Sequence, residues 1–136
     1  MINPWKRTNT LEEAAKGAGV IFDPIDPNFL PYGMKEDGFF FMQGMAEARY
    51  RRDEDRLTLR RTNISVKNIS GDYHSYPKSY YLDAGGMSVL CRGTEDKVND
   101  AEFEPFGCRC SISYNPGQPG NGLTHAQVIA IAQAMK

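Results

Sequence analysis

The chain has 136 residues, which is enough for one compact domain and too few for two domains of ordinary size. Its 16 Lys and Arg residues balance 17 Asp and Glu residues, so the formal net charge is −1. This balance argues against a dedicated nucleic-acid-binding protein, which would carry a large basic excess. We therefore expect a single domain over residues 1–136 and no nucleic-acid partner.

Localisation signals are weak in this sequence. No segment approaches the roughly 18 apolar residues that a membrane-spanning helix needs, and the first ten residues lack the apolar region of a secretory signal. The cysteines are odd in number, which favours a reducing compartment over a disulfide framework. These features predict a cytoplasmic protein with no membrane span, or a chain whose export leader has been removed.

The first predicted element is a short helix over residues 11–18. Thr10 and Glu13 have the spacing of a capping box, in which each side chain binds a backbone amide of the first turn. Gly19 follows as a natural left-handed terminator. Prolines then interrupt residues 22–38, so we expect an irregular connection there.

Strands are predicted next. Apolar and charged residues alternate over 46–51 and again over 56–60, with the polar turn 53–55 between them. This pattern indicates a hairpin with one apolar and one charged face. Further strands are expected at 64–69, 79–82, 87–92 and 107–114. Gly85-Gly86 is a hairpin signal between two of these segments.

The C-terminal part reads as a loop followed by a helix. Residues 115–122 are rich in Gly, Pro and Asn, as loops are. Thr124 and Gln127 repeat the capping-box spacing, and the helix should run to Met135 with an apolar stripe facing the sheet. The predicted fold class is α+β, a curved antiparallel β-sheet with a short N-terminal helix and a C-terminal amphipathic helix packed on one face.

Several segments together resemble an uncharacterised bacterial family, domain-of-unknown-function family 4367. The matching segments are Asn3-Pro4-Trp5, 11–14, 18–20, 30–31, Tyr50, Arg60-Arg61, 69–73, Gly93, Ala101, 110–113 and the closing amphipathic helix. The run Ile69-Ser70-Gly71-Asp72-Tyr73 is the most specific of them. The chain departs from the family pattern at Phe103, where the family places Trp, and at Cys110, where it places Tyr; both sites are expected to pack in the core.

The resemblance implies a small α+β domain, alone or attached to extracytoplasmic proteins, with no established activity. A looser similarity to the curved sheets of lipoprotein-carrier-like proteins would suggest an apolar ligand, although a fold does not fix a function.

The cysteines are the first candidate site. Cys108 and Cys110 share a face of one predicted strand, and Cys91 ends another strand that could lie beside it. On a regular strand, however, the two sulfurs of Cys-x-Cys lie too far apart to converge on one metal ion. The alternation of Cys110, Ile112 and Tyr114 favours buried packing, so we predict no metal site and no cofactor.

Asp72 and His74 are the nearest approach to an acid–base pair. A carboxylate beside an imidazole would orient it as a general base, which would make a small hydrolase-like enzyme. The same segment also suits a structured turn, in which Asp72 caps backbone amides and Tyr73 covers the core. His125, in the first turn of the last helix, is expected to be exposed and neutral. The phosphate loop, the Gly-x-Ser-x-Gly elbow and the His-Glu-x-x-His helix are all missing from the sequence.

Two surfaces are candidates for binding. Arg49, Arg51, Arg56 and Arg60 share one strand face and could grip a phosphate or carboxylate, although a solvated face protected by charge against edge pairing is the simpler interpretation. The tyrosines of the second surface are expected either to line a ligand groove or to pin a loop onto the core. They are Tyr73, Tyr76, Tyr80 and Tyr81.

We therefore expect a non-enzymatic binding or interaction module for a small molecule or a protein. The rival is the hydrolase that would use Asp72 and His74. The chain is expected to be a monomer or a homodimer, because the apolar segment 39–42 would be an unusual sheet edge and could pair two copies.

Overall fold

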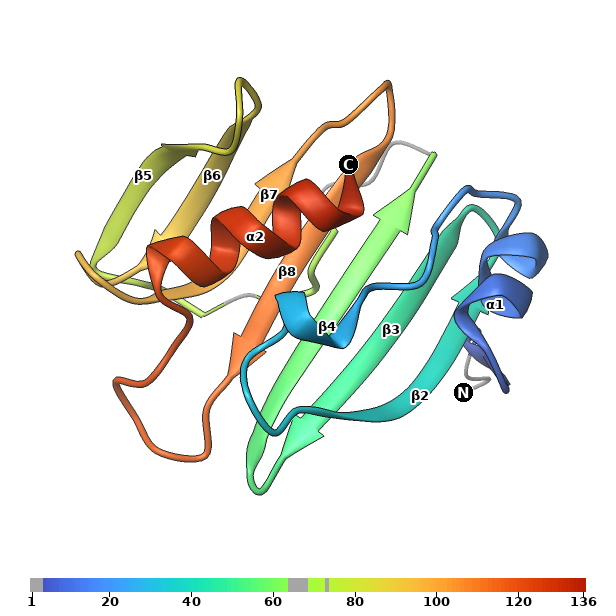
Figure 1. Cartoon of the computed structure of the whole chain (residues 1–136), viewed down its shortest axis with the longest axis horizontal. Coiled ribbons are helices and arrows are strands. Elements are labelled where there is room, and N and C mark those ends of the chain that lie inside the picture. The colour runs from blue at the N-terminus through green and yellow to red at the C-terminus, as the bar shows by residue number, and fades with distance from the viewer. Residues whose placement is uncertain (1–3, 64–68, 73) are drawn as a thin grey trace.

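One antiparallel sheet forms the body of the protein. The computed structural model describes residues 4–63, 69–72 and 74–136, and within these ranges eight strands lie in the order β1-β2-β3-β4-β8-β7-β6-β5 (Figure 1). The strands are β1 (Lys6–Thr8), β2 (Lys35–Met42), β3 (Met45–Arg52), β4 (Asp55–Thr62), β5 (Lys78–Asp83), β6 (Ser88–Gly93), β7 (Val98–Phe103) and β8 (Arg109–Asn115). Two α-helices, α1 (Leu11–Ala18) and α2 (His125–Met135), lie over the same face. The predicted α+β class is confirmed.

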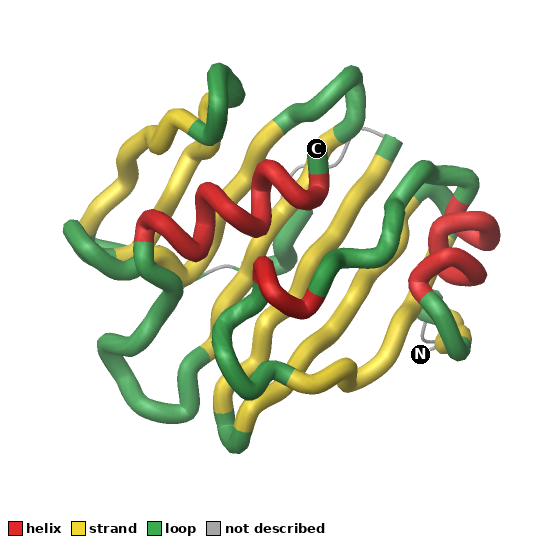
Figure 2. Tube along the Cα trace, in the orientation of Figure 1, coloured by secondary structure: helices red, strands yellow, loops and turns green. Residues whose placement is uncertain are grey.

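The sheet consists of two meanders joined at one seam. Strands β1 to β4 follow one another in space as they do in the chain, and so do β5 to β8 (Figure 2). The seam pairs β4 with β8, from Arg56 opposite Asn115 to Thr62 opposite Arg109. Because of this order, β4 and β8 lie in the middle of the sheet.

Helix α1 has the predicted bounds, but only the Thr10 half of its predicted capping box forms among the described residues. The Thr10 hydroxyl accepts the Glu13 amide at 3.1 Å, and Gly19 ends the helix with a φ of 75°. Gly17 faces the ring of Phe41 on β2, where a Cβ atom would lie 2.7 Å from ring carbons. Glycine at this position therefore allows α1 to approach the sheet closely.

The predicted irregular connection over 22–38 is correct only for its first part. A 3-10 helix, η1 (Pro27–Phe29), lies in it, but β2 already begins at Lys35. A bulge between Glu36 and Gly38, with Gly38 at a φ of 124°, lets β2 pair with β3 through this polar segment. The pairing of β2 with β3 thus outweighs the local preference of residues 35–38 for an irregular conformation.

Two strands of the structure are missing from the sequence-based prediction, and one predicted strand falls mostly on residues that the structure does not describe. The expected strand 64–69 lies mostly outside the described residues. Strand β7 was not predicted, because its sequence VNDAEF contains mainly residues of low β propensity; it forms between β6 and β8. Strand β1 was also missed, and its pairing with Phe39–Phe41 means that the apolar segment of β2 is not a sheet edge. The premise for dimerisation through that segment is therefore wrong.

The two faces of the sheet differ in chemistry. The face beneath the helices carries an apolar row whose members are direct cross-strand neighbours: Tyr80, Cys91, Ala101, Ile112, Leu59, Ala48 and Phe39. The opposite face, here called the outer face, carries the row Tyr81, Leu90, Glu102, Ser111, Arg60, Glu47, Phe40 and Arg7. The predicted division into an apolar and a charged face is therefore correct for the β3–β4 hairpin.

Helix α2 closes the apolar face. Its capping box between Thr124 and Gln127 forms as predicted, and its stripe of Val128, Ile131 and Met135 is buried. At its C-terminal end, the buried guanidinium of Arg61 donates to the Met135 carbonyl and approaches the Cys110 sulfur at 3.7 Å. The partial negative charge of the helix dipole at this end stabilises a nearby cation. No helix among the described residues has the length and apolarity needed to cross a membrane.

A single carboxylate fastens the 116–122 loop to the β3–β4 turn. Asp55 accepts the Tyr114 hydroxyl at 2.5 Å and the Gly117 amide at 2.7 Å, and Arg52 lies 3.5 Å away. Gly117 approaches so closely that a Cβ atom would lie 2.3 Å from the Cβ of Glu54. The hydrogen bonds from Tyr114 and Gly117 lower the pKa of Asp55, and burial together with Asp55 raises the pKa of Tyr114 to about 12.

We predict that Asp55→Asn lowers the free energy of unfolding by about 1.5–3 kcal/mol at pH 7, the value of hydrogen bonds to a charged group. The pKa of Asp55 is lower in the folded state than in the unfolded state. Its stabilisation is therefore complete above the unfolded value, about 3.9, and is lost as the pH falls through the folded one. Urea denaturation from pH 7 to pH 2 should show the difference between wild type and variant shrinking below about pH 4. Asp23→Asn, at an exposed position, is the control. A difference independent of pH would contradict this account.

Candidate functional site

The structure separates the tyrosines that the sequence grouped together. Tyr80 and Tyr81 are consecutive on β5 and point to opposite faces of the sheet. Tyr80 is half-buried beneath α2, where its hydroxyl donates to the Thr94 carbonyl at 2.8 Å and lies 2.9 Å from Nε2 of His125. Tyr81 is 69% exposed on the outer face. Tyr73 lies outside the described residues. The described tyrosines therefore do not line a single groove. The expectation that His125 is exposed is wrong, because its ring lies against Tyr80 and the residue is partly buried.

Tyr76 belongs instead to a turn organised by Asp72. The Asp72 carboxylate accepts the Tyr76 hydroxyl and, at 2.9 Å, the His74 amide, so the predicted capping role of Asp72 is confirmed. Burial and the hydrogen bond to Asp72 raise the pKa of Tyr76. The pKa of Asp72 is lowered: burial acts to raise it, but the hydrogen bonds from Tyr76 and His74 outweigh that effect.

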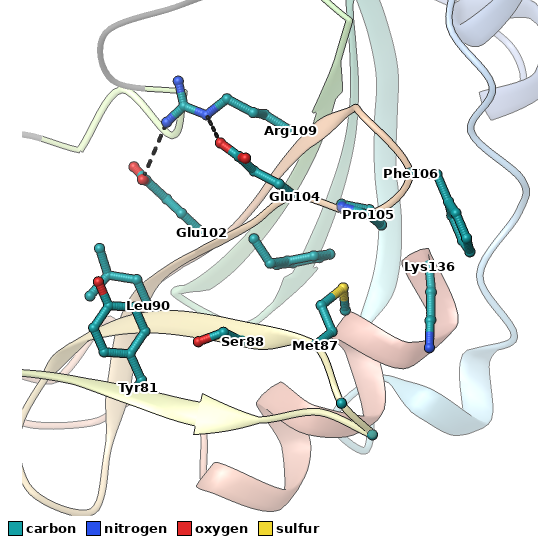
Figure 3. A pocket seen from close by; sticks show the side chains of 13 residues that line it. Tyr81, Met87, Ser88, Leu90, Glu102, Glu104, Pro105, Phe106, Arg109 and Lys136 are labelled. Carbon is teal, nitrogen blue, oxygen red and sulfur yellow. Dashed lines mark hydrogen bonds and ion pairs between the residues drawn. The ribbon is translucent and has the colours of Figure 1, made fainter.

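The predicted acid–base pair also forms within this turn. Nδ1 of His74 lies 2.7 Å from Oδ1 of Asp72, the arrangement in which a carboxylate orients an imidazole. However, the His74 side chain is 76% exposed. Asp72, His74 and Tyr76 line neither the cavity of about 240 Å³ over β3 and β4 nor the cavity of about 660 Å³ beside β6 and β7 (Figure 3). Among the described residues, the pair therefore has the orientation of a general base but lines neither of these two cavities.

The charged side chains of β3 and β4 are not simply solvated. Glu47 is fully buried on the outer face, although it sits among charged neighbours. One of its oxygens accepts Nε of Arg49 at 2.5 Å, and the other accepts Nε of Arg60 at 2.6 Å. A buried carboxylate is stable only when it is paired and hydrogen-bonded in this way. The expectation of a solvated face is therefore wrong at this position.

Both arginines are also held by aromatic rings. The guanidinium of Arg49 stacks on Phe40, with 3.8 Å between its Cζ and the ring centroid, and that of Arg60 lies 5.0 Å from the ring of Trp5. Arg60 further donates to the Ile69 carbonyl at 2.8 Å. Stacking and ion pairing fix both guanidinium planes. Contacts within the protein therefore fix the geometry of both guanidinium groups.

A cavity of about 240 Å³ lies over this cluster, and we call it the arginine cavity. Its cations are Arg49, Arg56 and Arg60, and its acids are Glu47 and Asp37. The remaining residues that line it are Tyr50, Thr58, Ser70, Ser113 and Asn115. Three guanidinium groups against two carboxylates leave a local charge of +1, surrounded by hydroxyl and amide donors. This combination suits an anion better than a cation or an apolar molecule.

Arg56 is the least compensated cation in the cavity. Among the described residues it has no hydrogen-bond or ion-pair partner, and the same holds for the terminal Nη atoms of Arg49. Arg56 lies directly opposite Arg51, which itself lines a neighbouring cavity with Asp37 and Lys35. Like charges directly opposite each other destabilise a sheet. Of the four predicted arginines, the structure thus brings Arg49, Arg56 and Arg60 to one cavity and places Arg51 in the neighbouring one.

Buried polar side chains are also found on the outer face of β7, on the other side of the β4–β8 seam. Asp100 is 2% exposed and binds Nη1 of Arg92 at 2.9 Å, and burial raises its pKa despite Arg92 and a hydrogen bond from Ser70. Its Oδ1 atom and the hydroxyl of buried Ser111 lack hydrogen-bond partners among the described residues. The sequence analysis assigned neither Asp100 nor Ser111 to a site, because their burial depends on segments far away in the sequence.

The cysteines behave as core residues where they are buried. Cys91 and Cys110 are fully buried, and desolvation raises the pKa of each thiol to about 12. Cys108 is half-buried and lies in the turn before β8 rather than on the strand. In the part of the chain that the structure describes, no group of three His, Cys, Asp or Glu side chains is arranged to hold a metal ion.

No protein-family model, curated protein or solved structure matches this chain. The resemblance to family 4367 is not tested by these comparisons and stays a prediction.

We predict that Glu47→Gln destabilises the protein by about 3 kcal/mol, because it leaves Arg49 and Arg60 without their shared counter-charge. Both arginines keep some contact with solvent, which places the effect at the lower end for a broken buried pair. Chemical denaturation at low salt measures the change. Glu95→Gln removes an exposed carboxylate and should change stability by less than about 0.5 kcal/mol. Equal stabilities of the two variants would show that Glu47 does not organise the arginines.

Proposed function

We propose that this protein is a non-enzymatic binding module and that its ligand is a small molecule carrying a phosphate or carboxylate group. The group binds in the arginine cavity. Arg49 and Arg56 present free guanidinium N–H groups to it, and Thr58 and Ser113 offer hydroxyls at the cavity wall. Guanidinium groups match such oxyanions in charge and in planar geometry.

The observation that carries this proposal is that Arg56 lies opposite Arg51 and has no hydrogen-bond or ion-pair partner among the described residues. Two arginines in direct cross-strand register repel each other and weaken the empty sheet. An anion bound at Arg56 would replace this repulsion by charge-assisted hydrogen bonds, each worth about 1.5–3 kcal/mol. The arrangement therefore favours the occupied state.

The size of the cavity limits the ligand and its affinity. About 240 Å³ accommodates one anionic group with a short substituent rather than a polymer. At a ceiling of about 1.5 kcal/mol per non-hydrogen atom, a five-atom phosphate binds no more tightly than about 3 µM. We expect sub-millimolar binding of inorganic phosphate and tighter binding of the natural ligand, which has further contacts.

Isothermal titration with sodium phosphate, at constant ionic strength, tests the proposal. Arg56→Gln should weaken phosphate binding at least about tenfold, the loss of one charge-assisted contact. The same variant should fold at least as stably as wild type, because it removes the repulsion with Arg51. Loss of binding without loss of stability would separate a ligand contact from a structural role.

Lys78→Gln is the matched control for this experiment. Lys78 is an exposed cation on β5 of the same sheet, and it lines neither the arginine cavity nor its neighbour. Its replacement should leave phosphate affinity unchanged. Equal weakening by both substitutions would show that phosphate responds only to overall charge. Unchanged binding in Arg56→Gln would contradict the proposed site.

The rival activity is a hydrolase that uses His74, and the 2.7 Å contact with Asp72 is the observation in its favour. We predict that His74→Ala changes stability by less than about 0.5 kcal/mol, because the side chain is largely exposed. We also predict no change in the hydrolysis of activated esters such as p-nitrophenyl acetate. A fall of a hundredfold or more in turnover, with the fold retained, would establish the enzyme instead.

A further inference from the structure

A cavity of about 290 Å³ lies on the helix side of the sheet, at the start of α1, and we call it the α1 cavity. Helix α1 packs against β2 and β3 (Figure 1). The walls of the cavity come from residues 9–12, from residues 24–25 of the following connection, and from β2 and β3. Segments that are distant in the sequence therefore build it together.

The floor of the α1 cavity is apolar and aromatic. Its side chains are buried and belong to the core cluster beneath the helices: Leu11, Ile25, Phe39 and Tyr50. Covering these side chains removes apolar surface from water, which favours a ligand that carries an apolar group.

The rim of the α1 cavity is acidic. Glu12 and Glu36 line it, and neither carboxylate has a hydrogen-bond or ion-pair partner among the described residues. The first turn of α1 adds the partial positive charge of a helix N-terminus, which is smaller than the charge of one carboxylate. The remaining lining residues carry no charge; they are Asn9, Thr10 and Pro24. The cavity therefore attracts a cation.

The larger cavity beside β6 and β7 shows the opposite arrangement. Figure 3 shows its carboxylates paired within the protein, with Arg109 3.3 Å from Glu102 and 3.6 Å from Glu104. At the α1 cavity, Arg52 lies on the same face of β3 as Tyr50, but Asp55 and the Tyr32 carbonyl hold it and it does not line the cavity. The negative charge of the α1 cavity is thus left for a ligand.

A buried hydroxyl group also lacks a partner here. Tyr50 is 5% exposed, and its hydroxyl has no hydrogen-bond partner among the described residues. Its oxygen is not one of the fully enclosed unpaired atoms, so it opens to the cavity that Tyr50 lines. Glu36 lies directly opposite Tyr50 on β2, and burial together with this carboxylate raises the pKa of Tyr50 to about 12. The hydroxyl is therefore neutral at pH 7, and an unpaired polar group of this kind costs stability until something bonds to it.

We propose that the α1 cavity binds a small primary amine with an apolar or aromatic body. The body lies on the apolar floor, the ammonium group donates hydrogen bonds to the Glu36 carboxylate and the Tyr50 hydroxyl, and Glu12 adds a second negative charge. The site shares Tyr50 with the arginine cavity, but that cavity lies on the outer face, whereas the Tyr50 side chain belongs to the core beneath the helices. The proposal is therefore independent of the anion site.

These observations select an amine among small ligands. An anion would be repelled by the two carboxylates, and a neutral hydrocarbon would cover the floor but leave the Tyr50 hydroxyl unpartnered. A metal ion needs several oxygen ligands around it, and the described residues hold no group of three suitable side chains. Aromatic rings such as those of Phe39 and Tyr50 also attract organic cations.

Titration of the ¹⁵N-labelled protein with benzylamine, followed by NMR at pH 7 and low ionic strength, tests the proposal. For a ligand of this size we expect a dissociation constant of about 1 mM. The amide resonances of Leu11, Glu36 and Tyr50 should shift. Benzyl alcohol and benzoate carry the same ring with a neutral or a negative group, and each should bind at least about tenfold more weakly.

Glu12 and Glu13 provide a matched test and control. Both are exposed acids in the first turn of α1, but of the two only Glu12 lines the cavity. Glu12→Gln should weaken benzylamine binding about threefold, the value of one solvent-exposed ion pair, and the double variant Glu12→Gln/Glu36→Gln about tenfold. Glu13→Gln removes the same charge from the same turn and should leave the affinity unchanged.

Tyr50→Phe separates binding from folding. It removes the hydroxyl and keeps the ring, so no hydrogen bond among the described residues is lost and the melting temperature should not fall. The affinity for benzylamine should fall about fivefold, the loss of one hydrogen bond to a ligand.

Three outcomes would overturn the proposal. In the first, benzylamine shifts no amide resonance at the α1 cavity. In the second, benzyl alcohol or benzoate binds there as tightly as benzylamine, which would identify an apolar or an anionic ligand instead. In the third, Glu12→Gln and Glu13→Gln have equal effects and Tyr50→Phe has none, which would show that the amine responds only to the overall charge of the protein.

Discussion

The outer face depends on one carboxylate. Glu47 is buried among arginines on a central strand, and each of its oxygens holds the Nε atom of a different guanidinium. Without it, Arg49 and Arg60 would lose the bonds that orient them. Because the ion pairs use the Nε side of Arg49, its terminal nitrogens remain available to the cavity. The same interaction therefore stabilises the folded outer face and would leave these nitrogens free for the proposed anion.

The sheet separates two kinds of stabilisation. Beneath the helices, apolar side chains such as Leu59 and Ile112 are removed from water, which stabilises the fold without directional requirements. On the outer face, Arg49 and Arg60 compensate for the lost hydration of Glu47, whereas Arg92 compensates for only one oxygen of Asp100 among the described residues. The apolar face consequently tolerates changes that conserve volume, whereas the outer face depends on the geometry of individual pairs.

Local patterns in the sequence predicted much of this fold. The caps at Thr10 and Thr124 and the alternation along the β3–β4 hairpin depend on neighbouring residues, so they could be read directly. Strand β7 could not, because its pairing partners outweigh the weak β propensity of its own residues. The candidate arginines were correctly assigned to one face, but the burial of Glu47 and the isolation of Arg56 depend on distant segments. The tyrosines were grouped by sequence proximity, and the two-residue period of β5 separates Tyr80 from Tyr81.

The single seam between β4 and β8 has a consequence for how the chain folds. Within each meander, paired strands are close in sequence, and their hairpins can form rapidly from local contacts. The pairing of Arg56 with Asn115 instead requires closure of a long loop, whose entropy cost precedes any gain from the contact. We therefore expect the folding barrier to lie at the joining of two partly formed halves. The transition state should then be most sensitive to residues such as Leu57 and Ile112, which pack where the halves meet.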